Sequence, residues 1–279
     1  LSEESYYLIS AGAWTEYESD YLHKSLADSK FDSVNIYDCT SQWGVFSIAG
    51  PNSRSFLKKI VVSEDPDKTL SNREFPWLSY RDIEIGMCPV RALRVAYTGE
   101  LGWELHHPIE MQNYLLDILL SSGKEFNLKL VGARAQNWLR QEKSYKAFGS
   151  DLGRDAGPFE SNLSRFVDIN KNFLGKDALL KRKTDVSCVT LLIDGPKDID
   201  PWGREALYNE TEEVMLGRLT SAGYSVHFKR SIGIGYVKSS FSEVGTKLRI
   251  KIDDAFWNAE IVRDSPYDPQ NERIIDRAQ

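Results

Sequence analysis

The fold is decided by the stretch YTGELGWEL, which occupies residues 97–105. Its two glycines fit a place where a strand turns and resumes, because glycine tolerates tight turns and close backbone approach. If residues 102–107 form a strand, Trp103 and Glu104 face opposite sides of it, since side chains alternate along a strand. One interpretation is a hairpin with Trp103 in the core and Glu104 in solvent. The other turns Glu104 toward a cleft, where one carboxylate can accept two parallel hydrogen bonds from a ligand.

Strand and helix patterns alternate on both sides of this stretch. The expected strands lie at residues 6–10, 34–37, 44–49, 83–86 and 90–97. The expected helices lie at residues 14–26, 111–120 and 132–146, and a further helix starts near Pro51. Together these elements predict an α+β domain over residues 1–180.

The pattern changes after residue 180 to short strands separated by turn residues. These strands are expected at residues 189–193, 214–220, 231–237, 248–252 and 256–262. Such spacing without long helices predicts a small antiparallel β-barrel domain over residues 186–265, followed by a tail at residues 266–279. The charged stretch at residues 181–185 is the expected boundary.

Composition excludes several classes of protein. The 279 residues are 41% hydrophobic, which is enough for one large or two modest folded domains. A net charge of −6 leaves no basic surface for nucleic acid or for an anionic membrane, so neither is expected as a partner. No stretch reaches the ~20 apolar residues that cross a bilayer, and we expect a soluble protein.

Cysteine and metal chemistry fit the sequence poorly. Cys39, Cys88 and Cys188 are odd in number and far apart, which is typical of small buried hydrophobes in a reducing compartment rather than of a disulfide or zinc framework. His106 and His107 alternate faces and lack thiols or carboxylates at ligand spacing. We therefore expect no metal site, and spacing alone assigns no catalytic residue.

A second carboxylate lies on the expected helix at residues 132–146. Glu142 shares a face with Trp138 and Leu139, so it lies on the apolar side and needs a partner there. We expect a structural role in which Glu142 is buried and hydrogen-bonded to backbone or to an arginine. Gln136 and Arg140 lie on an adjacent face, which solvent or a ligand could cover.

Taken together, the motifs resemble those of the glycine-cleavage T-protein (aminomethyltransferase) family. Residues 97–104 look like its YTGE-x-G-x-E segment. Further matches follow in the family's order: LRQEK at 139–143, FGSDL at 148–152, PFE at 158–160, FLGKDAL at 173–179, LTSAG at 219–223 and GYV at 235–237. The run GELGWELHH and the tail at 264–269 are most similar to the dimethylglycine and sarcosine dehydrogenase branch. The resemblance implies a folate-binding region followed by a C-terminal barrel.

The resemblance also implies an activity. In the family, an iminium or aminomethyl carbon passes to tetrahydrofolate, and in the dehydrogenase branch an upstream FAD domain makes the iminium from a small methylamine substrate. No glycine-rich nucleotide loop occurs in this sequence, so we expect FAD only on an upstream flavin domain or subunit. The N-terminal part of the folate domain is expected to be missing as well, and the chain alone to be inactive. The implied location is the cytoplasm or the mitochondrial matrix.

Three candidate ligand-binding residues carry over by position. Glu104 matches the family's pterin-binding glutamate, Tyr97 opens the same motif, and Tyr145 matches an aromatic residue that lines the folate pocket. The aspartate that acts as base in the family lies upstream of the first strand, so the catalytic residue stays unknown. A non-catalytic regulatory or binding module of the same fold is the alternative, and methyl transfer from another small donor is a third.

Two positions depart from T-proteins. Gln136 stands where they have an arginine, and Arg165 stands where they have a tryptophan. The dehydrogenase branch also departs at the first position, so Gln136 indicates the branch. It leaves the anionic tail of folate without that partner, and Arg134 or Arg140 is a candidate replacement.

Overall fold

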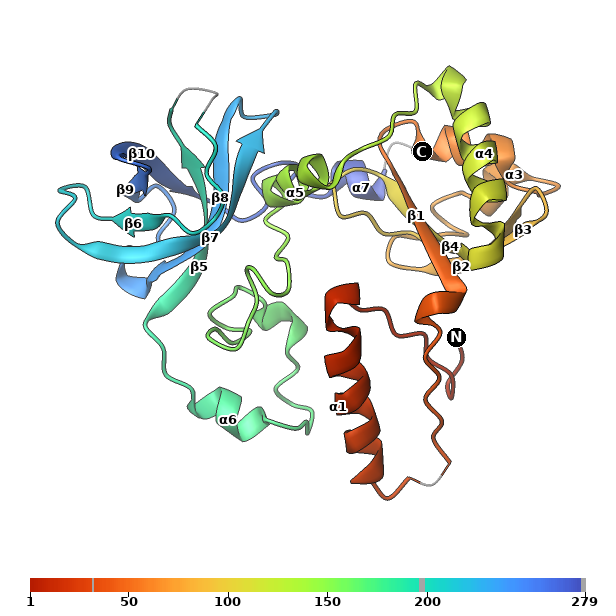
Figure 1. The fold of residues 1–279 in the computed structure, drawn as a ribbon, viewed down its shortest axis with the longest axis horizontal. Coiled ribbons are helices and arrows are strands. Elements are labelled where there is room, and N and C mark those ends of the chain that lie inside the picture. The colour runs from red at the N-terminus through yellow and green to blue at the C-terminus, as the bar shows by residue number, and fades with distance from the viewer. Residues whose placement is uncertain (32, 196–198, 277–279) are drawn as a thin grey trace.

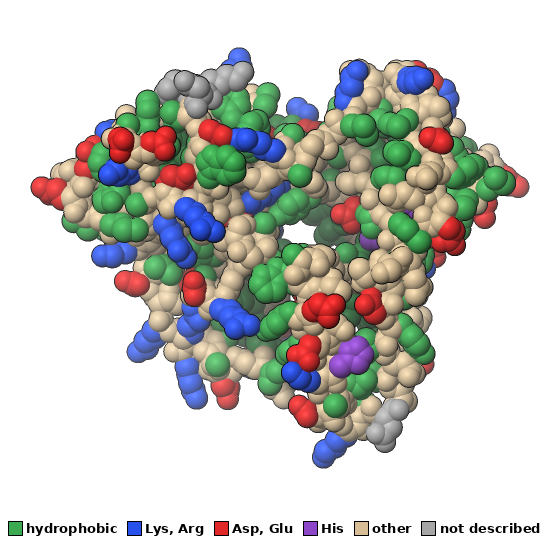
Figure 2. Space-filling model, viewed as in Figure 1, with side chains coloured by type: hydrophobic (Ala, Val, Ile, Leu, Met, Phe, Trp, Pro, Cys, Tyr) green, Lys and Arg blue, Asp and Glu red, His purple; other side chains and the backbone are tan. Residues whose placement is uncertain are grey.

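The computed structural model describes residues 1–31, 33–195 and 199–276. Three parts are visible in Figure 1: a sheet with its covering helices, a barrel, and an N-terminal segment that carries helix α1 (Thr15–Ala27). Helix α5 (Ala133–Glu142) lies between the sheet and the barrel. The space-filling view in Figure 2 shows an opening at the centre, between these parts.

The first domain is built on one antiparallel sheet in the order β1-β4-β3-β2. Its strands are β1 (Trp43–Ala49), β2 (Tyr80–Ile85), β3 (Cys88–Leu93) and β4 (Gly102–Pro108). Helices α2 (Ser53–Ile60) and α4 (Gln112–Gly123) supply apolar side chains to its core, and α3 (Pro66–Thr69) follows α2. Leu57, Trp103 and Leu115 are fully enclosed there, so one sheet face is dry.

The second domain is a closed barrel in the order β10-β5-β8-β7-β6-β9. Its strands are β5 (Val186–Ile193), β6 (Ala206–Tyr208), β7 (Met215–Ser225), β8 (Arg230–Lys238), β9 (Lys247–Ile252) and β10 (Ala255–Val262). The pairing of β7 with β8 shifts register between Leu219 and Ser221, a bulge of the kind that lets a sheet curve and close. At Gly217 a side chain would collide with the backbone carbonyl of Tyr236, so the two strands approach there as only glycine allows.

Two connecting stretches join these domains. Residues 143–185 leave α5 and include the short helix α6 (Lys176–Lys181) before the barrel begins. After β10, residues 263–276 return to the sheet domain and end in α7 (Glu272–Ile275). The second crossing means that the barrel is tied to the sheet at both of its ends.

The predicted α+β domain with an antiparallel barrel after it is confirmed. Two expected strands, at residues 6–10 and 34–37, were wrong: both stretches are irregular. An extended segment becomes a strand only when a neighbouring segment pairs with its backbone. Among the described residues, the only β-bridge near these two stretches is the local one between Ser2 and Ser5. The helix expected to reach residue 146 ends at Glu142, because Ser144 adopts a left-handed backbone with φ +54°.

Candidate functional site

The two faces of strand β4 differ in their surroundings. Trp103, Leu105 and His107 point into the core below the sheet and are buried. Glu104 points to the other face of the sheet. There it lies opposite Ser47 of β1, and Ser47 is exposed. Its side chain is 30% exposed, so it is neither a core carboxylate nor a fully solvated one. The functional interpretation of the YTGELGWEL stretch requires this position.

Two residues that sequence reasoning did not select lie beside Glu104. Oε2 of Glu104 is 3.3 Å from Nε2 of His106, and Nδ1 of His106 is 3.1 Å from the hydroxyl of Tyr7. The Arg91 guanidinium stacks over the Tyr7 ring at 5.4 Å. A signal for His106 was available, because residues two apart on a strand share a face. The sequence gives no such signal for Tyr7, because its segment is distant in sequence and lies against the sheet only in the folded chain.

Tyr97 and Tyr145 form a stacked pair. Their ring centroids are 5.9 Å apart and their planes differ by 16°. The Tyr97 hydroxyl donates to the carbonyl of Lys146 at 3.2 Å, which ties the β3–β4 connection to the segment after α5. Burial raises the pKa of both phenols, so both stay protonated as donors at neutral pH. The structure therefore brings together two of the residues selected from the sequence.

The loop that carries Tyr97 is clamped from two sides. Gly99 has φ +79°, and a side chain there would collide with Lys143 below it. Glu100 accepts a hydrogen bond from the hydroxyl of Tyr267, which belongs to the C-terminal segment. Lys143 is itself held by the carbonyl of Asp268 at 2.6 Å. These contacts fix the start of the motif relative to the helix and the tail.

Glu142 and Arg140 lie at the junction of α5 with the barrel. Glu142 is buried and accepts hydrogen bonds from the hydroxyl of Ser225 and the backbone N–H of His227, which confirms the predicted burial and the predicted hydrogen bond to backbone. Arg140 is 1% exposed and forms an ion pair with the buried Asp151. Its guanidinium is therefore enclosed, and Arg140 is excluded as a partner for an external anion.

The other candidate, Arg134, is exposed, and so is Arg165. Arg134 pairs with Asp200 and stacks over Trp202 at 5.3 Å. Arg165 is exposed, and its positive charge acts to lower the pKa of Tyr145 against the larger effect of burial, which places it near the stacked tyrosine pair. Of the positions that depart from T-proteins, Arg165 is the one that adds a cation beside a selected residue.

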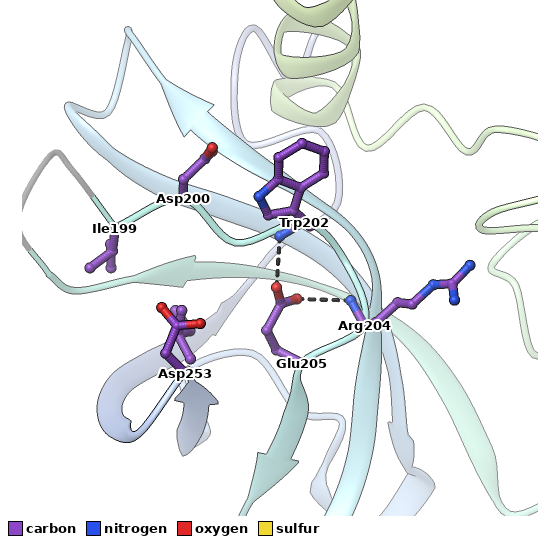
Figure 3. Close-up of a pocket in the computed structure, with 7 residues that line it drawn as sticks. Ile199, Asp200, Trp202, Arg204, Glu205 and Asp253 are labelled. Carbon is purple, nitrogen blue, oxygen red and sulfur yellow. Dashed lines mark hydrogen bonds between the residues drawn. The ribbon is translucent and has the colours of Figure 1, made fainter.

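A surface pocket on the barrel offers no comparable chemistry. It is lined by the following residues (Figure 3): Ile199, Asp200, Trp202, Arg204, Glu205, Ile252 and Asp253. Its central carboxylate, Glu205, accepts hydrogen bonds from the backbone N–H groups of Trp202, Gly203 and Arg204 at 2.7–2.8 Å. Glu205 thus closes its own loop. Within the described ranges, no cluster of three potential metal-binding side chains occurs and no helix is long and apolar enough to cross a membrane.

Comparison with known proteins agrees with this arrangement. Residues 1–171 match the sequence profile of the GCVT N-terminal domain, and residues 187–268 match that of the glycine cleavage T-protein C-terminal barrel domain. The chain belongs to the glycine cleavage T-protein family. Its fold is similar to the crystal structure of the glycine cleavage system aminomethyltransferase T from Bartonella henselae, with a TM-score of 0.73, 19% identity, and coverage of 91% of this chain and 67% of that one.

Relatives of this T-protein-family chain include dehydrogenases, an oxidase and aminomethyltransferases. Mitochondrial dimethylglycine dehydrogenase of Mus musculus is 34% identical over 266 residues, covering 92% of this chain and 29% of that protein. An aminomethyltransferase of Caldanaerobacter subterraneus subsp. tengcongensis is 29% identical, covering 92% of this chain and 67% of that protein. The chain thus spans less than a third of the length of its dehydrogenase relatives.

Proposed function

We propose that this chain binds a reduced folate through Glu104 and serves the transfer of a one-carbon unit to it, as part of a dimethylglycine- or sarcosine-dehydrogenase-like enzyme. The observation that carries the proposal is the place of Glu104 on the sheet face away from the helices, with a carboxylate that is partly exposed. The amino-pyrimidinone edge of a pterin presents two parallel N–H donors, which one carboxylate accepts. The residues present therefore fit the ligand.

The stacked tyrosines support the same ligand. An aromatic pair with nearly parallel planes offers a flat apolar wall, and a planar ring system packs against such a wall. Arg165 adds a positive charge near Tyr145, which suits the carboxylates of a folate tail and offsets the arginine that Gln136 replaces. Arg140 is enclosed and does not take this part.

The bound folate supplies the amine nitrogens that accept the carbon. The chain's residues hold its pterin by the carboxylate and its flat face by the tyrosines, and they limit the access of water to it. A small methylamine donor and an FAD domain elsewhere in the enzyme belong to the same proposal, since the dehydrogenase relatives extend well beyond this region. A mitochondrial location, like that of the dimethylglycine dehydrogenase relative, is part of the proposal too.

The deciding experiment uses the natural polypeptide that contains residues 1–279. Tetrahydrofolate is titrated into the parent protein and into Glu104→Gln, and after formaldehyde is added the rate of methylene-tetrahydrofolate formation is compared with the rate without protein. We expect the affinity of Glu104→Gln to fall at least tenfold, because the amide sets an N–H₂ group against a donor edge. Glu110→Gln, at an exposed carboxylate, is the matched control and should bind like the parent.

Each other outcome decides against the proposal. No folate binding by the parent, or equal affinity in the parent and in Glu104→Gln, contradicts the assignment of the ligand or of the residue. Binding without any acceleration over the rate without protein contradicts the transfer activity and leaves a regulatory or binding module of the same fold.

A further inference from the structure

We propose that His106 is a positioning residue for Glu104, and that Tyr7 sets the ring tautomer that makes this possible. The inference rests on the proposed folate role of Glu104 and names what holds its carboxylate ready. Three side chains from two distant segments form one hydrogen-bonded row, from the hydroxyl of Tyr7 through the imidazole of His106 to the carboxylate of Glu104.

The direction of the hydrogen bonds follows from the carboxylate. An ionised carboxylate only accepts, so Nε2 of His106 must carry the proton directed at Glu104. In a neutral imidazole the other nitrogen, Nδ1, is then an acceptor, and the hydroxyl of Tyr7 donates to it. Burial raises the pKa of Tyr7, which keeps this phenol protonated and able to donate. Tyr7 therefore selects the tautomer that Glu104 needs.

Packing encloses the middle of the row. The His106 side chain is 2% exposed, whereas that of Glu104 is 30% exposed. The Tyr7 ring meets the imidazole edge-on, with 5.6 Å between the ring centroids. The Arg91 guanidinium lies over the Tyr7 ring, 5.4 Å from its centroid. His106, in the middle of the row, is thus enclosed, whereas Tyr7 and Glu104 at its two ends are each partly exposed.

This arrangement decides how Glu104 meets a ligand. The 3.3 Å contact from His106 engages Oε2 and limits rotation of the carboxylate, and the acceptor positions that remain on its two oxygens are left for a ligand. A carboxylate held in one orientation loses less conformational freedom on binding and aligns better with paired donors. His106 should therefore favour ligands that have the 2-amino group of the pterin over analogues that lack it.

The test measures equilibrium binding in the natural polypeptide that contains residues 1–279. The ligands are tetrahydrofolate and an analogue without the 2-amino group, and the variants are His106→Phe, His106→Gln and Tyr7→Phe. We expect His106→Phe to weaken tetrahydrofolate binding about tenfold, the scale of one hydrogen bond to a charged group, with little change for the analogue. His106→Gln should restore most of the affinity, because its amide N–H₂ can occupy the place of Nε2–H.

Tyr7→Phe keeps the ring contacts and removes only the donor to Nδ1. We expect about a threefold loss for tetrahydrofolate, smaller than for His106→Phe, and this variant keeps the proposal testable if His106→Phe does not fold. Equal losses for both ligands, or no recovery in His106→Gln, would mean that His106 serves the fold alone and would overturn the inference. If Glu104→Gln loses binding while His106→Phe and Tyr7→Phe keep it, the folate site stands and the positioning role falls. If the parent binds no folate, both fall.

Discussion

Charged side chains are enclosed at the junction between α5 and the barrel, and each is matched with a partner of the right kind. Arg140 meets Asp151, whose other oxygen accepts from Thr220 at 2.5 Å. Glu142 meets Ser225 and the backbone of His227. Removing one partner leaves the other buried without a hydrogen bond. The loss of such a residue therefore lowers the free energy of unfolding, even where the intact pair adds little to it.

The first prediction concerns Glu142. Glu142→Gln keeps an acceptor for Ser225 but buries an N–H₂ group where the carboxylate had an oxygen, so the free energy of unfolding should fall by about 1–3 kcal/mol. Folate affinity should change little, since Glu142 lies at the barrel junction and not on the open face of the sheet. Urea denaturation measures the first quantity, with Glu110→Gln as the exposed control. A variant as stable as the parent but weaker in folate binding would make Glu142 a ligand residue.

Sequence reasoning reached some of these residues and not others. Helical spacing was enough to place Glu142 on an apolar face, because the period of a helix is a local property. The partners of Arg140 were not accessible in the same way, since Ser221 lies 81 residues further along the chain and meets it at 2.6 Å only through the fold. The contact between Tyr7 and His106 could not be predicted for the same reason, since 99 positions separate the two residues.

At the scale of elements, the C-terminal tail acts as a clasp. The sequence indicated only a tail after the barrel, yet residues 264–276 supply partners to buried cations of the first domain. Arg54 pairs with Asp276 at 3.0 Å, Arg94 donates to the carbonyl of Ile275 at 2.7 Å, and Lys143 donates to the side chain of Asn271 at 2.7 Å. The two arginines also stack on the buried ring of Trp103, so the tail completes a site within the core.

The second prediction is that deleting residues 266–279 destabilises the sheet domain more than the barrel. Arg54, Arg94 and Lys143 would each lose the tail's acceptors, at a cost of about 1–3 kcal/mol apiece. Hydrogen exchange should therefore speed up in α2 and around residues 70–80 before it does in β5 and β8. Glu272→Ala, an exposed change within α7, should leave exchange as in the parent. Uniform exchange in the truncated chain would show that the clasp is not needed.

The sequence predicted the long strands of the barrel better than the shortest strand and better than the strand ends. The five long barrel strands were found because alternation and turn residues are local, whereas β6 has only three residues and was missed. β7 runs to Ser225, five residues beyond its expected end, because β8 pairs with it along that length. Pairing with a distant strand extends an element in a way that its own residues do not encode.

The whole molecule consists of two apolar cores joined by polar contacts. One core lies under the sheet and the other fills the barrel. Between them run α5, the residues after it and the returning tail, where Ser144 hydrogen-bonds Thr190 of β5 at 2.7 Å and the backbone of Ser265 at 2.8 Å. Such polar contacts are directional, so they fix how the two cores face each other across the central opening (Figure 2). The division into residues 1–180 and 186–265 stays a prediction.

Alkaline pH offers a test of global stability through Cys188 of β5. Burial raises the pKa of this thiol from 9.0 to about 12, so the unfolded chain releases the proton at lower pH than the folded chain does. A raised folded-state pKa contributes stability that is complete below pH 9 and is lost as the pH rises toward 12. The raised pKa of Tyr236, about 12, acts in the same direction, while the lowered pKa values of Lys143 and Arg94 act against it.

Because these contributions overlap, the third prediction is a difference between variants. Cys188→Ala removes one titrating group, and at pH 10 the parent should have lost about 1.4 kcal/mol relative to that variant, compared with pH 8. The measurement is urea denaturation of both chains at pH 8, 9 and 10. Val189→Ala, at a neighbouring buried position without an ionisable group, should follow the parent's pH dependence. If the parent and Cys188→Ala lose stability in parallel over this range, the thiol ionises alike in the folded and unfolded chains, and its burial does not raise its pKa.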